Sequence, residues 1–354
     1  MQKIFDRDIL KELFVNEFIS NDYESWVQIY EKLTTTTNFD NTPVNMDDVG
    51  NLKRKTLSNK QFFAHNGIPS ETPDFKWYYG RRYDANNIGL KHRIYINFKR
   101  QDVVNMAYLF IGKCIKYDVK FVFKYTKFSN NFDKFIIYST DEQLPIYKTI
   151  IEELENENKE VFDRIGDAPI TSYTFGNNYG YAPEIENSGT SFNQRCAEAL
   201  MEAFRLTLLD LSKDIHMDDF SVPSFLYIFL HNNLLTMSEI YGEDKEVFRI
   251  NFPRKEFTSY FENIKPKFIE RILNQDISEE MLKNNDSVAS FSINDRRYNI
   301  YANDIIDLRK TLFKKIKDKY GEEYVYDYLL NKVKEIFTKE SLIFDLPKEL
   351  SYMR

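Results

Sequence analysis

Three short stretches in the middle of the chain carry the residue types that could do chemistry. They are His92–Arg100 (HRIYINFKR), with an arginine, Phe121–Tyr125 (FVFKY), with a lysine, and Gly176–Arg195 (GNNYGYAPEIENSGTSFNQR), with the glycine- and serine-rich start of a helix. Cationic side chains can hold a phosphate, and an amine that has lost its proton can remove a proton from a neighbouring carbon. We therefore expect a site in this part of the chain.

The helix that begins near the end of the third stretch has the pattern of a capping box at its start. Ser191 and Gln194 are spaced so that the serine oxygen accepts a hydrogen bond from a first-turn amide while the glutamine reaches back. The same turn leaves free N–H groups at the positive end of the helix dipole, which suit an anion. Arg195 follows within the first turn, within reach of a phosphate held there. An ordinary cap behind a surface loop is the alternative, and it is commonplace.

The first stretch alternates as a strand does. Arg93, Tyr95 and Asn97 share one face, and apolar residues occupy the other. For a single strand, solvent is the default environment of such a polar face. A polar cleft becomes the favoured interpretation because the next predicted strand carries Lys124.

Lys124 lies among aromatic residues, since Phe121, Phe123 and Tyr125 occupy the other face of its strand. An amine that is partly desolvated and close to other cations loses its proton more readily, which is how a lysine becomes a general base. Lys127 is expected to begin a turn, so Lys124 is the preferred base. The competing interpretation is an edge-strand lysine that prevents strand association.

Four histidines occur, and none has the spacing of a metal-ligand set, so we expect no metal site. His65 lies in a polar loop and is free to approach a cleft as a general acid. His92 faces away from Arg93 if the strand alternates.

Familiar catalytic motifs are missing. The chain has no GxSxG elbow, no P-loop and no GxGxxG fingerprint, which argues against acyl transfer, NTP hydrolysis and dinucleotide chemistry. We therefore expect no cofactor. Glu184 and Glu186 are spaced like the paired glutamates of ADP-ribosyltransferases, but the serine-rich strand motif that precedes such pairs is absent. That interpretation is weak.

Composition narrows the class of protein and its partners. Lys and Arg number 48 against 55 Asp and Glu, and no dense basic run suggests nucleic-acid binding. Cys114 lies on an apolar helical face and is expected to be a small buried hydrophobe. No signal-peptide pattern opens the chain and no apolar stretch approaches a membrane span. We expect a cytoplasmic protein that contacts no membrane, and export as a type III effector stays open because such signals have no readable pattern.

The elements that must position these residues follow from periodicity. We expect strands at 93–98, 119–125 and 134–139, with a helix at 102–117, begun by Asp102, covering their apolar face. Helices at 144–162 and from Ser191 to about 211 complete the set. This order predicts an α+β fold with a small mixed sheet flanked by helices.

Three regions are expected along the chain. Residues 1–74 form a helical N-terminal region, 75–211 the α+β core and 212–354 a mainly helical C-terminal region. In the last region the pattern predicts helices at 221–241, 254–274, 304–320 and 322–338, with one strand at 296–301.

The order RIYINF, FVFKY, FDKFIIY, FGNNYGYAPE and SGTSFNQR resembles the HopA-type family of bacterial type III effectors. It also resembles the family's relatives in ribosomal-peptide biosynthesis, which are lyase partners of kinases in lanthipeptide and thioamitide pathways. The resemblance covers approximately residues 75–210 and consists of short motifs. It implies a fold like that of phosphothreonine lyases and, in the biosynthetic members, elimination of phosphate from phosphoserine or phosphothreonine. It also implies a phosphorylated peptide or protein as substrate and a separate kinase as partner.

By position, Arg93 matches the arginine of the family's Arg-x-Tyr-x-Asn strand and Lys124 the lysine that ends the next strand. Asp133 and Tyr138 match an Arg-x-Asp…Leu-Tyr segment.

Ser191, Phe192 and Arg195 match the family's Ser-Phe-Gly…Arg helix start. Two positions depart from the pattern: Asn131 stands where an arginine is expected and Asn193 where a glycine is usual. The first removes a candidate phosphate ligand and the second narrows the helix start, and either change implies a shifted substrate or a protein that binds without turning over.

The leading hypothesis is a lyase that eliminates phosphate, such as one that dehydrates a ribosomal precursor peptide. Lys124 removes the Cα proton and His65 or Tyr95 protonates the leaving group, with no metal or cofactor. The expected phosphate ligands are Arg93, Asn97, Ser191 and Arg195. The alternative is a non-enzymatic effector or scaffold that binds a protein partner through this fold, with its helical C-terminal region as the docking surface.

Overall fold

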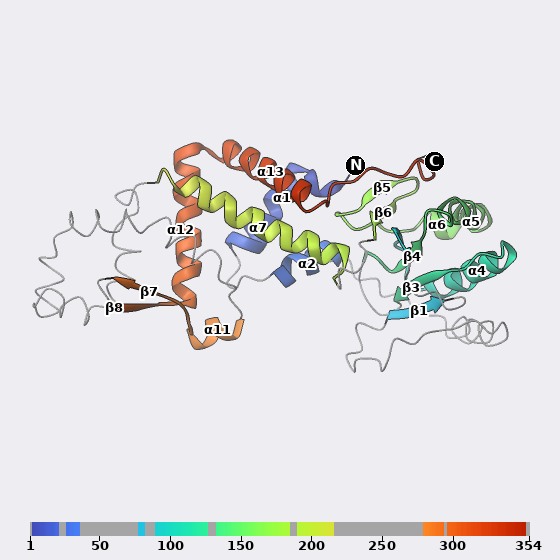
Figure 1. Cartoon of the computed structure of the whole chain (residues 1–354), viewed down its shortest axis with the longest axis horizontal. Helices are drawn as coiled ribbons and strands as arrows, with labels where there is room; N and C mark the ends of the chain where they lie inside the picture. Colours follow the sequence, from blue (N-terminus) through green and yellow to red (C-terminus); the bar gives the residue numbers. More distant parts are fainter. Residues whose placement is uncertain are drawn as a thin grey trace, which may run out of the picture. The chain divides into compact units, whose positions relative to one another are not determined.

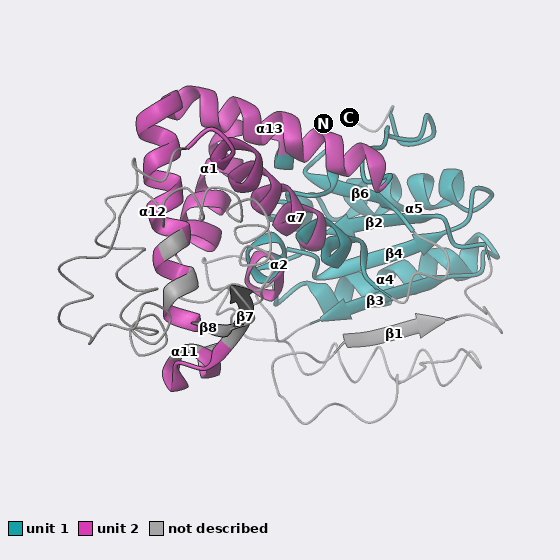
Figure 2. Ribbon diagram, turned by 60° about the vertical axis from the view of Figure 1, so that its left-hand side comes forward, with its two compact units in different colours: residues 1–4, 30–197, 341–354 teal, residues 5–29, 198–340 magenta. Residues whose placement is uncertain are grey.

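The computed structural model describes residues 2–20, 26–35, 89–126, 132–184, 190–215, 279–293 and 296–351, and the backbone of 77–81. The chain splits into two compact units, each built from separate stretches (Figure 2). Unit 1 comprises Met1–Ile4, Tyr30–Ala197 and Ser341–Arg354, and unit 2 comprises Phe5–Ile29 and Glu198–Glu340. The three consecutive regions expected from the sequence therefore remain a prediction about the chain's organisation.

Unit 1 contains a six-stranded sheet in the order β1-β3-β4-β2-β6-β5 (Figure 1). The strands are β1 (Trp77–Arg81), β2 (His92–Ile96), β3 (Val122–Thr126), β4 (Phe135–Ser139), β5 (Tyr173–Phe175) and β6 (Tyr179–Pro183). The three strands expected from the sequence lie together in it, and the α+β class is confirmed. The sheet is antiparallel rather than mixed. Strands β2 and β3, which a helix connects, do run in the same direction. They are not neighbours, however, because β4 lies between them and is antiparallel to both.

One face of the sheet is the core of unit 1. Helices α4 (Val103–Lys116) and α5 (Leu144–Glu157) pack on this face (Figure 2). Phe110 of α4 lies at the centre of the contact, with its ring centroid 5.5 Å from Phe123, 5.6 Å from Phe135 and 5.7 Å from Tyr147. Each such aromatic pair adds about 0.5–1.5 kcal/mol beyond the burial of its area. The expected helical cover of the apolar face is confirmed.

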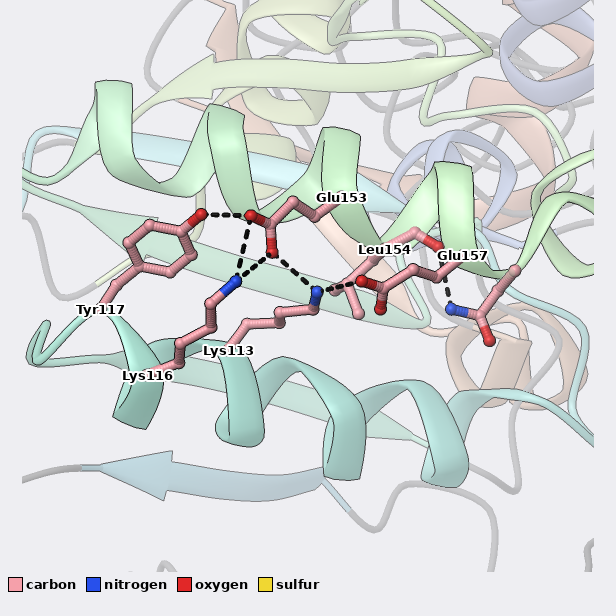
Figure 3. A network of polar contacts seen from close by, with 7 residues as sticks. Lys113, Lys116, Tyr117, Glu153, Leu154 and Glu157 are labelled. Carbon is pink, nitrogen blue, oxygen red and sulfur yellow. Dashed lines mark hydrogen bonds and ion pairs between the residues drawn. The ribbon is translucent and has the colours of Figure 1, made fainter.

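A polar network joins α4 to α5 at the edge of this core (Figure 3). Glu153 of α5 accepts hydrogen bonds from Lys113 at 2.7 Å and Lys116 at 3.3 Å, and from the hydroxyl of Tyr117. Lys113 also pairs with Glu157. The hydrogen bond from Lys113, followed by that from Tyr117, lowers the pKa of Glu153 to about 2.

Two helix boundaries differ from the expectation in informative ways. Asp102 stands at the N-cap of α4, but its side chain makes no capping hydrogen bond and instead accepts from Arg164 at 3.0 and 2.8 Å. The predicted helix 144–162 is divided at Asn158, whose backbone leaves the helical region (φ −134°) and whose amide donates to the Leu154 carbonyl at 2.9 Å. A short helix, α6 (Lys159–Phe162), follows.

The second face of the sheet is partly covered by the segment 166–172. Gly180 of β6 permits this close approach: a Cβ there would lie 2.6 Å from the Ser172 hydroxyl oxygen and 2.8 Å from the Ala168 Cβ. Only a residue without a side chain fits between the strand and this segment.

Both ends of the chain complete unit 1. Gln2 donates from Nε2 to the Thr171 carbonyl at 2.9 Å and to the Leu342 carbonyl at 3.1 Å. Phe344 packs edge-on against Tyr181 and Phe192, with ring centroids 5.6 and 5.4 Å away. The first and last described stretches are therefore tied to one another through this unit.

Unit 2 is mainly helical. It contains α1 (Arg7–Glu12), η2 (Leu13–Ile19), α11 (Glu279–Asn284), α12 (Ala302–Tyr320), α13 (Glu322–Lys339), part of α2 (Trp26–Thr34), most of α7 (Phe192–Ser212) and a hairpin of β7 (Ser287–Ile293) and β8 (Arg296–Tyr301). Phe14, Phe18, Phe204 and Phe313 form its aromatic core. The expected helices 304–320 and 322–338 and the strand 296–301 are confirmed. The expected helices 221–241 and 254–274 lie outside the described residues.

Within the described part of the chain, no helix combines the length and the apolar character needed to cross a membrane.

Candidate functional site

Strand register gathers several of the predicted site residues on the face of the sheet opposite α4 and α5. Arg93 of β2 lies directly opposite Tyr138 of β4, whereas Tyr95 and Lys124 both lie opposite Ile136. Residues directly opposite one another in antiparallel strands share a face. Arg93, Tyr95, Lys124 and Tyr138 therefore lie on one face, which we call the polar face.

Arg93 is held by an acidic partner that sequence reasoning did not assign to the site. Its guanidinium donates to the Glu184 carboxylate from Nε and from Nη2, the latter at 2.7 Å. The two side chains are only 9% and 19% exposed, so the pair is largely shielded from water. Burial alone would lower the pKa of Arg93, but the hydrogen bonds to Glu184 and the charge interactions with Tyr95, Tyr138 and Glu184 together outweigh it and raise the pKa. Tyr138 flanks the guanidinium, with its ring centroid 5.5 Å from Cζ.

Tyr30 of α2 is a second residue that the sequence did not single out. Burial raises the pKa of its phenol, and the charge of Asp133 adds to the rise. Lys124, a hydrogen bond with Ser191, and Arg93 oppose the rise. One phenol thus lies within electrostatic reach of three predicted site residues from three different elements. In the sequence, Tyr30 is only one member of a helix's apolar stripe, so no local signal could have identified it.

The end of α2 is fixed beside the start of β4. The amide of Phe132 donates to the Thr34 carbonyl at 2.8 Å, and the Thr34 hydroxyl donates back to the Tyr30 carbonyl at 2.8 Å. These bonds fix the turn of helix that carries the Tyr30 phenol relative to Asp133, which follows Phe132.

Tyr95 lies deeper than the other residues of the polar face. It is 1% exposed, and its hydroxyl lies close to the Arg93 guanidinium without making a hydrogen bond of normal geometry with any residue that the structure describes. Burial raises its pKa, partly offset by the charge of Arg93. A phenol enclosed to this degree offers a substrate no direct approach, so Tyr30 is the better placed of the two tyrosines to meet one.

Asn97 has a structural task. Its Nδ2 donates to the Asp167 carbonyl at 2.9 Å, and its own carbonyl accepts from the Gly166 amide at 2.8 Å. The side chain is 6% exposed. Asn97 therefore holds the start of segment 166–172 on the sheet, and its predicted role as a phosphate ligand remains a prediction.

The cap expected at Ser191 is present. The Ser191 hydroxyl accepts from the Gln194 amide at 3.1 Å, and its carbonyl accepts from the Arg195 amide at 3.1 Å. Asn193, which stands where the related motif has glycine, is 4% exposed and accepts from the Thr171 hydroxyl at 2.6 Å. That bond ties the helix start to segment 166–172. Convergence of the Arg195 side chain with Arg93 remains a prediction.

Some predicted positions lie outside the described residues. They are His65, Lys127 and Asn131. The role of His65 as a general acid is therefore a prediction that the described geometry does not reach.

His92 lies on the core side of β2, as alternation predicts. Its Nδ1 is 2.9 Å from the Tyr181 hydroxyl and its Nε2 is 2.9 Å from Asp141. Burial raises the pKa of Tyr181 to about 12. These contacts place His92 away from the polar face, in a side-chain network of its own.

No group of His, Cys, Asp and Glu able to hold a metal ion occurs among the described residues. Both cysteines are buried with free thiols, and Cys114 belongs to the core of unit 1, as expected. Burial raises the pKa of the Cys196 thiol, which disfavours a reactive thiolate.

Comparison with known proteins adds little. No family model matches the chain, and no curated protein matches it. Among solved structures, the chain is similar to an effector protein from Pseudomonas syringae pv. syringae strain 61, with 13% identity and a TM-score of 0.43 over 57% of this chain and 87% of that one. It is also similar to an effector protein from Pseudomonas syringae pv. tomato strain DC3000, with 14% identity and a TM-score of 0.40 over 58% of this chain and 87% of that one. Likeness at this level carries no argument about activity.

Proposed function

We propose that this chain is a carbon–oxygen lyase that eliminates phosphate from phosphoserine or phosphothreonine in a peptide or protein. The observation that supports it is the gathering of Arg93, Lys124 and Ser191 around the phenol of Tyr30. A guanidinium, an amine, a hydroxyl at a helix start and a phenol are the groups that such an elimination needs. The sequence motifs independently suggest the same reaction.

The proposed reaction is a β-elimination. Lys124, in its unprotonated form, takes the proton from Cα, and the electron pair of that C–H bond forms a double bond between Cα and Cβ. The Cβ–O bond breaks, and the phosphate leaves with its bonding electrons. Arg93 stabilises the charge that develops on the leaving oxygens. The products are a dehydrated residue and inorganic phosphate, and no oxidant or reductant is consumed.

Tyr30 is the proton donor in this proposal. A phenol carries its proton at neutral pH, so Tyr30 has a proton to give. Burial raises the pKa of this phenol and makes it a weaker acid, so it gives up the proton only where negative charge develops beside it. A donor with this property acts on the leaving oxygen, where negative charge develops. Its hydrogen bond with Ser191 places it at the start of α7, where the helix dipole also favours an anion.

The substrate chemistry implies a preceding reaction. A phosphorylated serine or threonine is the product of a kinase, so a separate kinase must supply the substrate. In a biosynthetic setting the substrate would be a ribosomal precursor peptide, and a kinase gene beside a short precursor-peptide gene would favour that use.

Incubation with phosphothreonine peptides tests the proposal. Mass spectrometry should detect peptides that have lost phosphoric acid with the wild-type protein and not with Lys124→Ala. Folded wild-type protein that leaves every phosphopeptide intact would count against the lyase.

A non-enzymatic effector or scaffold is the second candidate. The observation that favours it is the Arg93–Glu184 pair, since two side chains that satisfy each other in a largely buried site also suit a purely structural role. Such a protein would bind a protein partner equally well with and without Lys124→Ala, and phosphopeptides would be recovered with their mass unchanged.

A further inference from the structure

We propose that Glu184 is a positioning residue of this site, whose carboxylate fixes the guanidinium of Arg93 in the orientation that meets the phosphate. The inference rests on the proposed function and deepens it by assigning a role to an acidic residue beside a phosphate ligand.

Strand register brings the two residues together. Arg93 of β2 lies opposite Ala182 of β6, and Glu184 is two residues further along, which by alternation is the same face. A diagonal neighbour at this spacing is within reach of long side chains. Because Ala182 is small, it leaves room for the Arg93 side chain to lie across β6 towards Glu184. Tyr138 on β4 closes the other side.

The hydrogen bonds leave part of the guanidinium for a ligand. Arginine has five N–H donors in a rigid plane, and Glu184 engages the one on Nε and one on Nη2. The other three are the second N–H of Nη2 and both N–H groups of Nη1, and the Tyr95 hydroxyl also lies within hydrogen-bond reach of the guanidinium. The Glu184 carboxylate binds the Nε–Nη2 edge of the guanidinium and thereby fixes the direction of the Nη1–Nη2 edge without occupying it. A phosphate can accept hydrogen bonds from the Nη1–Nη2 edge.

Both backbones are fixed, which favours positioning over displacement. The Glu184 amide donates to the Lys91 carbonyl at 2.8 Å, so the strand pairing of β2 and β6 continues through Glu184. Arg93 lies inside β2, between two paired strands. A carboxylate carried on a paired backbone holds its partner in one geometry, and such orientation accelerates the chemical step.

This arrangement has a kinetic signature. Glu184 carries the same sign of charge as phosphate, so removing its charge should not weaken the attraction for substrate. Glutamine keeps one acceptor oxygen but has an NH2 donor in place of the other, so the two-point contact is lost and the guanidinium can turn away from the leaving oxygens. Glu184→Gln should therefore lower kcat by about 10- to 100-fold with an unchanged or smaller KM.

The experiment compares kcat and KM for a phosphothreonine peptide among full-length wild type, Glu184→Gln, Glu184→Asp and Glu153→Gln, with folding checked by thermal unfolding. Glu184→Asp keeps the charge one methylene further away and should give an intermediate kcat. Glu153→Gln is the matched control, because it removes one carboxylate from an ion-pair network between α4 and α5 and should keep the wild-type kcat. Should Glu184→Gln fail to fold, the Glu184→Asp measurement decides.

NMR of the arginine Nε–H groups gives a readout that does not need turnover. The Arg93 Nε–H, assigned with Arg93→Lys, should exchange slowly in wild type and respond to added inorganic phosphate. A freely exchanging Nε–H, or wild-type kcat in the glutamate variants when wild type is active, overturns the inference alone. Absence of elimination by folded wild type overturns the proposed function and the inference that rests on it.

Discussion

The guanidinium of Arg93 and the carboxylate of Glu184 form a two-point ion pair between the neighbouring strands β2 and β6. The pair exists because Ala182 takes the position directly opposite Arg93, so the long side chain can reach a diagonal neighbour. Both partners are largely buried, so breaking the pair from one side would destabilise unit 1. We propose that the pair also orients the cation that holds phosphate.

Arg93→Ala should destabilise the protein strongly. Glu184 would be left only 19% exposed and without the counter-charge of Arg93, and breaking a buried pair from one side costs about 3–5 kcal/mol. Chemical unfolding followed by circular dichroism measures the loss. Lys3→Ala is the comparison, because Lys3 pairs with Asp167 and the two side chains are 40% and 61% exposed. An equal loss in the two variants would contradict the importance assigned to burial.

Lys124→Arg should abolish elimination of phosphate while leaving the fold and phosphopeptide binding largely intact. Arginine keeps the charge but does not lose its proton in proteins, so it cannot act as a base. Mass spectrometry of phosphothreonine peptides follows turnover, and fluorescence anisotropy follows binding. Wild-type turnover by this variant would remove Lys124 from the mechanism.

Tyr30→Phe and Tyr95→Phe should behave differently. Tyr30→Phe removes the proposed donor and should slow elimination by about 100- to 10,000-fold. The Tyr95 hydroxyl is buried and contacts Arg93 without a hydrogen bond of normal geometry, so its removal should change stability by no more than about 1 kcal/mol and slow turnover far less than Tyr30→Phe. Equal rates in the two variants would show that neither phenol donates the proton.

Gly180→Ala should destabilise unit 1. The added Cβ would lie 2.8 Å from the Ala168 Cβ and 2.6 Å from the Ser172 hydroxyl oxygen, and overpacking of this kind costs about 1–3 kcal/mol. Adding Ala168→Gly should recover part of the loss, because one of the two close contacts disappears. A double-mutant cycle of unfolding free energies measures this coupling, and strict additivity would mean that segment 166–172 adjusts freely.

The hydrogen bonds that Glu153 accepts from Lys113 and Tyr117 should make the thermal stability of the protein depend on pH in the acid range. Its folded-state pKa is lowered from 4.5 to about 2, chiefly by the hydrogen bond from Lys113. A lowered carboxyl pKa contributes stability that is complete above the unfolded value and is lost as the pH falls through the folded value. The melting temperature should therefore drop between about pH 4.5 and about pH 2, and less steeply in Glu153→Gln. Glu152→Gln, on the same helix with one contact to Lys148 at 3.6 Å, serves as the control.

Local pattern was sufficient for much of the fold. Alternation in 93–98 and 119–125 placed Arg93 and Lys124 on the face opposite the aromatic core, because side chains of a strand point to opposite sides in turn. The spacing of Ser191 and Gln194 likewise predicted the cap, since a helix start needs an acceptor for its first amides. These features depend on residues within a few positions of one another.

The residues that surround Arg93 and Lys124 could be identified only from the tertiary structure. Glu184 reaches Arg93 because β6 pairs with β2, and Tyr30 reaches the site because the end of α2 is tied to Phe132. The order of strands in a sheet and the docking of a distant helix come from burial summed over the whole unit. No short window of sequence contains that sum, so Glu184 looked like part of an isolated glutamate pair and Tyr30 like one more apolar contact.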